Sequence, residues 1–205
     1  MMDTQTVFVV DDEPAVRDSL RTLLGTYGLP VEAYASGQEF LNSMGKDRAG
    51  CLVADVRMPG MSGIDLQHEL ARRNIPIPVI VITGHGDVPM AVQALKAGAM
   101  DFIEKPINDD VLVNSIRSAL DHDRRSREDD VETGRLTERA QRLTPRETEV
   151  MDLIVSGLSN NAIAQKLGIS ARTVEHYRAN IMQKTEAASL SHLVRMAIRL
   201  GRLAA

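Results

Sequence analysis

Short apolar runs alternate with segments of helical periodicity through the first 120 residues. The apolar runs predict five β-strands, at 7–10, 31–34, 51–55, 79–83 and 101–104. The segments between the strands carry apolar residues at helical spacing, as Val16, Leu20 and Leu24 do in the first of them. Five successive strand and helix units predict an α/β fold with a doubly wound, five-stranded parallel sheet.

The tail of the chain shows only the helical pattern. A capping signal at Thr144 and Pro145 begins one helix, and three more are expected at about 159–167, 171–184 and 190–200. The helices at 159–167 and 171–184 are joined by a short turn that contains a glycine, which is the pattern of a helix-turn-helix. The tail is therefore predicted to be a small all-α domain of four helices.

A strongly charged stretch separates the two regions. Residues 121–141 read DHDRRSREDDVETGRLTERAQ and include few side chains that could form a core. Such a segment has little apolar surface to offset the entropy cost of ordering, so it is expected to be a linker, either irregular or continuing the preceding helix. The predicted organisation is a first domain at 1–122, a charged linker at 123–140 and a second domain at 141–205.

The net charge of −4 hides an uneven distribution of charge. Residues 1–125 carry 12 Lys and Arg against 18 Asp and Glu, whereas residues 139–205 carry 10 against 5. A basic tail behind an acidic first domain favours nucleic acid as the partner of the tail and a metal ion or a basic partner for the first domain.

Composition also bears on location. No apolar stretch approaches the roughly 20 residues of a membrane span, and the first residues lack the pattern of a signal peptide. The single cysteine, Cys51, lies in an apolar run and is expected to be a core residue. A cytoplasmic protein without membrane contact is expected.

Acidic residues stand where the first and third predicted strands end. Asp11 and Asp12 follow the first strand, and Asp55 ends the third. In a sheet of the flavodoxin-like order 2-1-3-4-5, ligands bind at the carboxyl ends of these two strands. Three carboxylates that meet there repel one another and require a cation. Because no His or Cys stands at these strand ends, Mg²⁺ is expected rather than zinc.

A hydroxyl and an ammonium end two further strands at the same edge. Thr83 ends the fourth strand and Lys105 follows the fifth. Each alone is more simply a turn hydroxyl or a surface lysine, but together with the acids they predict a reaction. A carboxylate beside a metal ion can attack a phosphoryl group, whose oxygens the metal, the lysine and the hydroxyl would hold. Asp55 is therefore predicted to be a phosphoacceptor, with Thr83 and Lys105 as its catalytic partners.

Four motifs in this region resemble those of response-regulator receiver domains, in particular the FixJ group: VVDDE, ADVRMPGMSG, VITGHGD and DFIEKP. The resemblance implies that Asp55 is the phosphorylated residue. It also implies that Asp12, Asp55 and the backbone carbonyl of Arg57 bind Mg²⁺ directly, with Asp11 as an outer ligand. Receivers of this kind carry an aromatic switch residue that changes rotamer together with the threonine, and here the pair is Phe102 and Thr83. A cis bond before Pro106 is typical of the family as well.

The tail sequence LTPRETEVMDLIVSGLSNNAIAQKLGISARTVEHYRANIMQKT resembles the helix-turn-helix of the NarL/LuxR and FixJ-type output domains. The resemblance implies that the helix at 171–184 enters the major groove of double-stranded DNA. Three cations are expected to contact phosphates, and four polar residues are expected to contact bases or phosphates. These residues are Arg172, Arg178 and Lys184, followed by Thr173, His176, Tyr177 and Asn180.

A phosphorylation-activated transcriptional regulator is the function that these features predict, most simply a FixJ-like activator. Phosphorylated Asp55 would draw in Thr83, Phe102 would pack into the vacated space, and the fourth helix with the fifth strand would become a homodimer surface. Apolar residues near that surface, part of which must pack on the sheet, are Ala91, Val92, Leu95 and Ala99.

The expected partners follow from the same resemblance: a sensor histidine kinase, FixL-like by analogy, then duplex DNA and RNA polymerase. The FixJ likeness also implies genes for nitrogen fixation or microaerobic metabolism, although regulators of one architecture control different genes. Three alternatives are a regulator of another set of genes, a phosphatase with Asp55 as covalent nucleophile, and an RNA-binding tail. Apart from its own phosphotransfer and dephosphorylation, the protein is not expected to be an enzyme.

Overall fold

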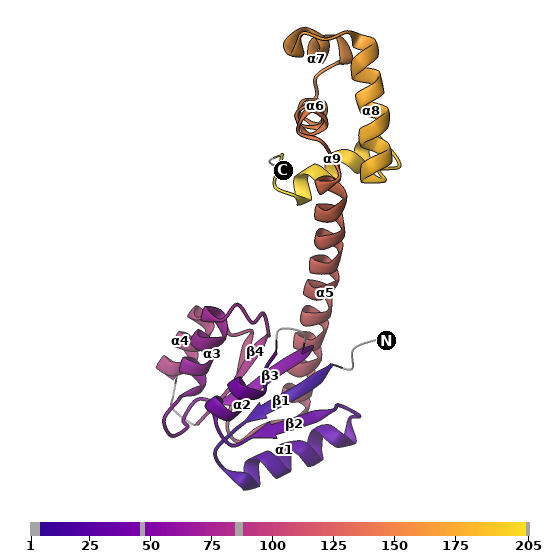
Figure 1. Ribbon diagram of the computed structural model, residues 1–205. Coiled ribbons are helices and arrows are strands. Elements are labelled where there is room, and N and C mark those ends of the chain that lie inside the picture. The colour runs from indigo at the N-terminus through magenta and orange to yellow at the C-terminus, as the bar shows by residue number, and fades with distance from the viewer. Residues whose placement is uncertain (1–4, 46–47, 85–87, 204–205) are drawn as a thin grey trace. The chain divides into compact units, whose positions relative to one another are not determined.

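The computed structural model describes residues 5–45, 48–84 and 88–203 of the chain. The chain divides into two compact units, and the division lies between Arg127 and Glu128. The first unit is an α/β sandwich, and the second is helical (Figure 1).

The first unit is built on a parallel sheet of five strands. The strands are β1 (Thr6–Val10), β2 (Val31–Tyr34), β3 (Gly50–Asp55), β4 (Val79–Thr83) and β5 (Asp101–Glu104). Their order across the sheet is β2-β1-β3-β4-β5, and every neighbouring pair is parallel. The predicted fold class and strand order are confirmed.

Helices cover both faces of this sheet (Figure 1). On one face lie α2 (Gly37–Ser43), α3 (Gly63–Arg72) and α4 (Val88–Lys96), and on the other lie α1 (Pro14–Thr26) and the first part of α5 (Asp109–Gln141). Alternate residues of each strand point to opposite faces. Phe8 and Leu52 therefore join one core cluster, and Val9 and Val53 join the other.

Helix α5 is 33 residues long and includes the whole charged stretch between the two regions. Its residues Asp123 and Arg127 belong to the first unit, although the sequence places them in the linker. Asp123 is buried and accepts hydrogen bonds from the Gly50 amide at 2.9 Å and from Arg127 Nε at 2.9 Å. A single carboxylate thus ties the last turns of the first unit to the start of β3.

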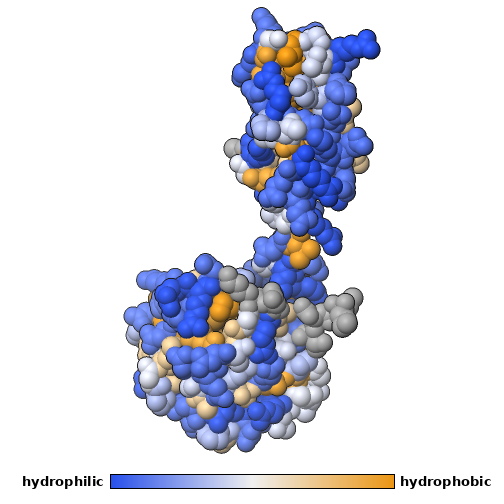
Figure 2. All heavy atoms as spheres, viewed as in Figure 1, coloured by the Kyte–Doolittle hydropathy of each residue, from blue (hydrophilic) through white to orange (hydrophobic). Residues whose placement is uncertain are grey.

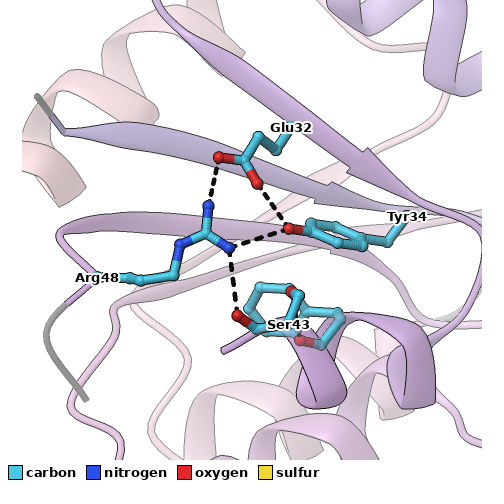
Figure 3. A network of polar contacts seen from close by, with 5 residues as sticks. Glu32, Tyr34, Ser43 and Arg48 are labelled. Carbon is cyan, nitrogen blue, oxygen red and sulfur yellow. Dashed lines mark hydrogen bonds and ion pairs between the residues drawn. The ribbon is translucent and has the colours of Figure 1, made fainter. Parts of the chain in front are cut away.

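Arg48 extends this polar network over the edge of the sheet. Its carbonyl accepts a hydrogen bond from Arg127 Nη2, at 2.5 Å. Its guanidinium lies between Glu32 and Tyr34, pairs with the Glu32 carboxylate and donates to the Tyr34 hydroxyl at 3.2 Å (Figure 3). The hydrogen bond from Arg48 is the largest cause of the lowered pKa of Glu32. The network therefore connects α5 to the outermost strand, β2.

The second unit packs four short helices around one core. These are α6 (Pro145–Val155), α7 (Asn160–Leu167), α8 (Ala171–Thr185) and α9 (Leu190–Arg199), each with a Ser or Thr side chain as its N-cap. Helices α7 and α8 are joined at Gly168, which has φ +66° and ends α7 in the left-handed conformation that glycine adopts at least cost. Val150, Ile163, Val174 and Ile181 lie in the core.

Cys51 is fully buried in β3. Burial, with a smaller contribution from the negative charge of Asp123, raises the pKa of its thiol to about 12.

None of the described helices combines the length and the apolar character that crossing a membrane requires. In the view of Figure 2, hydrophilic residues make up most of the surface of each unit.

Candidate phosphoacceptor site and DNA-reading helix

The predicted site residues of the first unit gather at the carboxyl edge of the sheet. Asp11 follows β1, Asp55 ends β3, Thr83 ends β4 and Lys105 follows β5. The parallel register aligns these ends, since the Val56 amide bonds to the Ile82 carbonyl and the Lys105 amide to the Thr83 carbonyl, each at 2.8 Å. The first three residues are buried, at 1%, 6% and 3% exposure. Polar groups at such depth require partners.

Lys105 is the main partner of the two buried carboxylates. Its Nζ lies 2.6 Å from Asp55 Oδ1 and 3.5 Å from Asp11 Oδ2. Burial alone would lower the pKa of Lys105, but the hydrogen bond and charge of Asp55, with help from Asp11, outweigh burial and raise it. Burial is also the largest cause of the raised pKa of Asp11, to which the charge of Asp55 adds. One ammonium thus faces two carboxylates that repel each other.

Backbone amides hold the remaining carboxylate oxygens in place. Asp55 Oδ2 accepts the Arg57 amide at 2.7 Å, and Asp11 Oδ1 accepts the Glu13 amide at 2.8 Å. Arg57, whose carbonyl the resemblance implies as a Mg²⁺ ligand, thus also contacts Asp55 through its amide. These bonds fix the orientation of both carboxyl groups at the ends of their strands.

Asp12 differs from the expectation that three carboxylates converge. Its side chain is exposed, in the bend that follows β1, whereas that of the preceding Asp11 is buried. No three His, Cys, Asp or Glu side chains of the described residues are grouped closely enough to hold a metal ion. The structure brings together Asp11 and Asp55 around Lys105 and leaves Asp12 beside them.

The donor set nevertheless fits a hard divalent cation. Asp11, Asp12 and Asp55 carry three negative charges against the single positive charge of Lys105, and all their donor atoms are oxygens. Mg²⁺ is held in proteins by one or two carboxylates and keeps several waters, so the two buried carboxylates suffice. Asp11, Asp12 and Asp55 are the carboxylates that would hold the ion.

Gly63, the first residue of α3, lies directly against the site. A Cβ at this position would overlap the carbonyl oxygen of Asp55, and the Gly63 amide donates to the Val56 carbonyl at 3.2 Å. Only a residue without a side chain allows α3 to begin this close to the end of β3.

We expect Gly63→Ala to displace the end of β3, to destabilise the first unit by roughly 1–2 kcal/mol, and to slow the phosphoryl transfer that the sequence predicts at Asp55. Thermal unfolding and labelling by acetyl phosphate would measure the two effects. Gly25→Ala in α1 is the matched control, because a Cβ there meets open space. Equal behaviour of the two variants would contradict this account of Gly63.

The two predicted switch residues differ in exposure. Thr83 is buried, with Oγ1 3.4 Å from the Gly84 carbonyl, whereas Phe102 in β5 is 39% exposed. Of the apolar residues expected near α4, Val92 and Leu95 are also exposed and Ala99 is buried against the sheet. The side chain of Ala91 lies outside the described residues. The Lys105-Pro106 bond is cis, as the resemblance implies.

In the second unit, α8 presents one exposed stripe along its length. The exposed positions recur at three and four residues, which places them on one face. They are Arg172, Glu175, His176, Ala179 and Gln183. Arg172 and His176 were expected on such a face, and Asn180 adjoins it with a 3.3 Å contact to the His176 ring. Glu175, Ala179 and Gln183 of this stripe were not predicted from the sequence.

The other four predicted DNA contacts take part in contacts within the domain. Tyr177 packs against the core, Thr173 shares a 2.8 Å hydrogen bond with the N-cap serine, and Arg178 donates to Asn160 of α7 at 3.2 Å. Lys184 Nζ pairs with Glu147 of α6 at 2.7 Å. Helical periodicity alone could not separate Arg178 and Lys184 from the exposed stripe, because their partners lie on other helices.

Fold and site together define a response regulator. Residues 7–117 match the response regulator receiver domain, and residues 141–197 match the bacterial regulatory proteins of the luxR family. The chain belongs to the response regulators that carry a LuxR-type DNA-binding domain, and the class predicted from the sequence is confirmed. It is a transcriptional response regulator rather than a typical enzyme.

Full-length relatives share this organisation. The chain is 48% identical to the transcriptional regulatory protein FixJ of Rhizobium meliloti over 98% of each chain. It is 45% identical to FixJ of Bradyrhizobium diazoefficiens over 96% of each chain. A solved structure of the response regulator StyR is 43% identical and aligns with a TM-score of 0.83 over 95% of this chain and 98% of that one.

Proposed function

We propose that Asp55 accepts a phosphoryl group and that this modification controls binding of the second unit to DNA. The observation that carries the proposal is the contact of 2.6 Å between Lys105 Nζ and Asp55 Oδ1, at a sheet edge that also holds Asp11 and Thr83. A buried carboxylate with an ammonium and a hydroxyl beside it has the groups that a phosphoryl oxygen requires.

In the proposed step, an Asp55 carboxylate oxygen forms the new bond to phosphorus while the bond from phosphorus to the donor's leaving atom breaks. Lys105 shifts its ion pair from the carboxylate to the phosphoryl oxygens, and the Thr83 hydroxyl donates to one of them. A bound Mg²⁺ would supply positive charge to offset the repulsion between the phosphoryl group and the carboxylates. Asp12, Asp55 and the Arg57 carbonyl are proposed to bind that ion directly, with Asp11 as an outer ligand.

The proposed consequence is a homodimer formed through α4 and β5. Movement of Thr83 toward the phosphoryl group would leave space for Phe102, which is exposed in the structure. Val92 and Leu95 of α4, together with Met100 before β5, would then form the apolar part of the interface, since each is at least 40% exposed. Pairing of the receivers would pair the DNA-binding domains, whose half-sites would lie about one helical turn, roughly 10 bp, apart.

The proposed partners act before and after the phosphorylation of Asp55. A sensor histidine kinase would supply the phosphoryl group, and duplex DNA with RNA polymerase would receive the signal. Similarity to the two FixJ proteins over nearly the whole chain supports a FixJ-like activator whose kinase is FixL-like. The same similarity supports genes for nitrogen fixation or microaerobic metabolism as its targets.

Labelling of the full chain with acetyl phosphate tests the proposal. With Mg²⁺ present, we expect a mass increase of one phosphoryl group at Asp55, a shift from monomer to dimer in sedimentation, and tighter binding to promoter DNA. Asp55→Asn should lose all three responses, and chelation of the metal should prevent labelling. Labelling at another residue, or labelling without any change in mass in solution or in DNA affinity, would contradict the proposal.

A further inference from the structure

One carboxylate of the DNA-binding domain differs from all the others. Between residues 143 and 203, the sequence has five acidic residues: Glu147, Glu149, Asp152, Glu175 and Glu186. Four of them form ion pairs, with Lys184, Arg146, Arg202 and the pair Arg139 and Arg142. Within the part of the chain that the structure describes, the Glu175 carboxylate makes no ion pair and no hydrogen bond. The position of Glu175 on α8 determines whether an unpaired carboxylate has a role there.

Glu175 stands on the exposed stripe of α8, the helix that would enter the major groove when the second unit binds DNA as proposed. Arg172 and Ala179 lie one turn away from it on either side. An exposed, unpaired glutamate is ordinary on a surface that faces only water. On a surface that approaches DNA it is costly, because it meets the field of the phosphates and offers them no donor.

Base edges in the major groove offer a way to offset that cost. A carboxylate accepts hydrogen bonds and cannot donate them. The donors in the major groove are the exocyclic amino groups, and the one that suits a carboxylate is the N4 amino group of cytosine, beside which no acceptor of the same base competes. Adenine presents N7, an acceptor, next to its amino group and would repel the second carboxylate oxygen.

We propose that Glu175 is a specificity-determining residue that reads a cytosine through its N4 amino group. The same charge disfavours sequences that lack an amino group at this position, so it acts both by attraction and by repulsion. The inference rests on the proposed function of α8 and adds to it the identity of one base pair.

The test is a selection of binding sites from randomised duplex DNA by the full-length protein after treatment with acetyl phosphate and Mg²⁺. We expect cytosine at one position of each half-site to be preferred about 5- to 150-fold, the range of a single mismatch. Glu175→Ala should lose the preference at that position only. Glu175→Gln should change it to adenine, because a glutamine amide matches the amino group and N7 of that base.

Glu149→Gln is the matched control, since it removes the same charge from the exposed side of α6 and should leave every base preference unchanged. The inference is overturned if Glu175→Ala strengthens binding to all sequences equally, or if the preference that it relaxes is for a base other than cytosine. If the wild-type protein selects no sequence at all, the proposed DNA-binding function fails instead. Unchanged melting temperatures of the Glu175 variants would show that their altered base preference does not come from a loss of folding stability.

Discussion

Replacing Asp123 with alanine is expected to destabilise the first unit by about 3 kcal/mol. The side chain is 1% exposed and accepts from the Gly50 amide, from Gln5 Nε2 and from Arg127 Nε. Its removal leaves the Gly50 amide buried without an acceptor, and it leaves the guanidinium of Arg127 without its carboxylate. The first loss falls on β3, the strand that carries Asp55 at its other end, and the second falls on α5.

Hydrogen exchange followed by mass spectrometry would measure this loss, because it reports the two units of the intact chain separately. Peptides from β3 should exchange faster in Asp123→Ala, whereas peptides from α6 should not change. The control is Asp121→Ala on the same helix. Asp121 pairs with Arg124 where both side chains are more than half exposed, and its loss should cost less than about 0.5 kcal/mol. Equal protection of β3 in the two variants would show that Asp123 is not an anchor.

Replacing Lys184 with methionine is expected to destabilise the second unit by about 2 kcal/mol. Glu147, its partner, is 3% exposed and would keep the Thr144 amide, at 2.8 Å, as a donor but lose its ammonium. Removing one member of a fully buried pair costs roughly 3–5 kcal/mol, and the smaller value applies because the Lys184 side chain is 35% exposed. The loss should appear in urea unfolding and in hydrogen exchange of α6 and α8.

The pair also sets a dependence on pH. The hydrogen bond from Lys184, followed by that from the Thr144 amide, lowers the pKa of Glu147 below its usual value. The ionised form is therefore favoured in the folded state. The pair stabilises the domain at neutral pH, and this stabilisation is lost as the pH falls through the lowered pKa. Lys184→Met should reduce the part of the acid sensitivity that comes from Glu147.

Arg172→Met separates this structural role from contact with DNA. Arg172 is exposed on α8, so its loss should leave stability unchanged and reduce the salt dependence of DNA binding by about one phosphate contact. Folded Lys184→Met should keep the salt dependence of the wild-type protein. A reduced salt dependence in Lys184→Met would instead support the phosphate contact that the sequence predicts.

Local patterns were enough to predict the sheet and the edge where the site lies. Alternation within each strand and the spacing of apolar residues in each helix depend on neighbours along the chain, and so does the capping signal at Thr144. Asp11, Asp55, Thr83 and Lys105 could be grouped because the carboxyl ends of parallel strands share an edge.

Contacts between distant segments could not be predicted in this way. Asp123 stands in a highly charged run, and only packing of α5 against the start of β3 makes it a buried anchor. Lys184 has the charge and the helix position expected of a DNA contact. Its ammonium instead pairs with the carboxylate of Glu147, 37 residues earlier in the chain. Asp12 neighbours a buried acid and is itself exposed in the bend after β1, where the alternation of the strand no longer sets the direction of a side chain.

The burial of Cys51 has a practical consequence for studies in solution. A thiol with a pKa of about 12 and no exposed surface contains almost no thiolate at neutral pH, so it will react slowly with maleimides and disulfide reagents. A cysteine introduced at an exposed position of α8, and another on the receiver, would then be the only reactive thiols. Paired spin labels or fluorophores could report how the spacing of the two domains responds to phosphorylation without removal of the native residue.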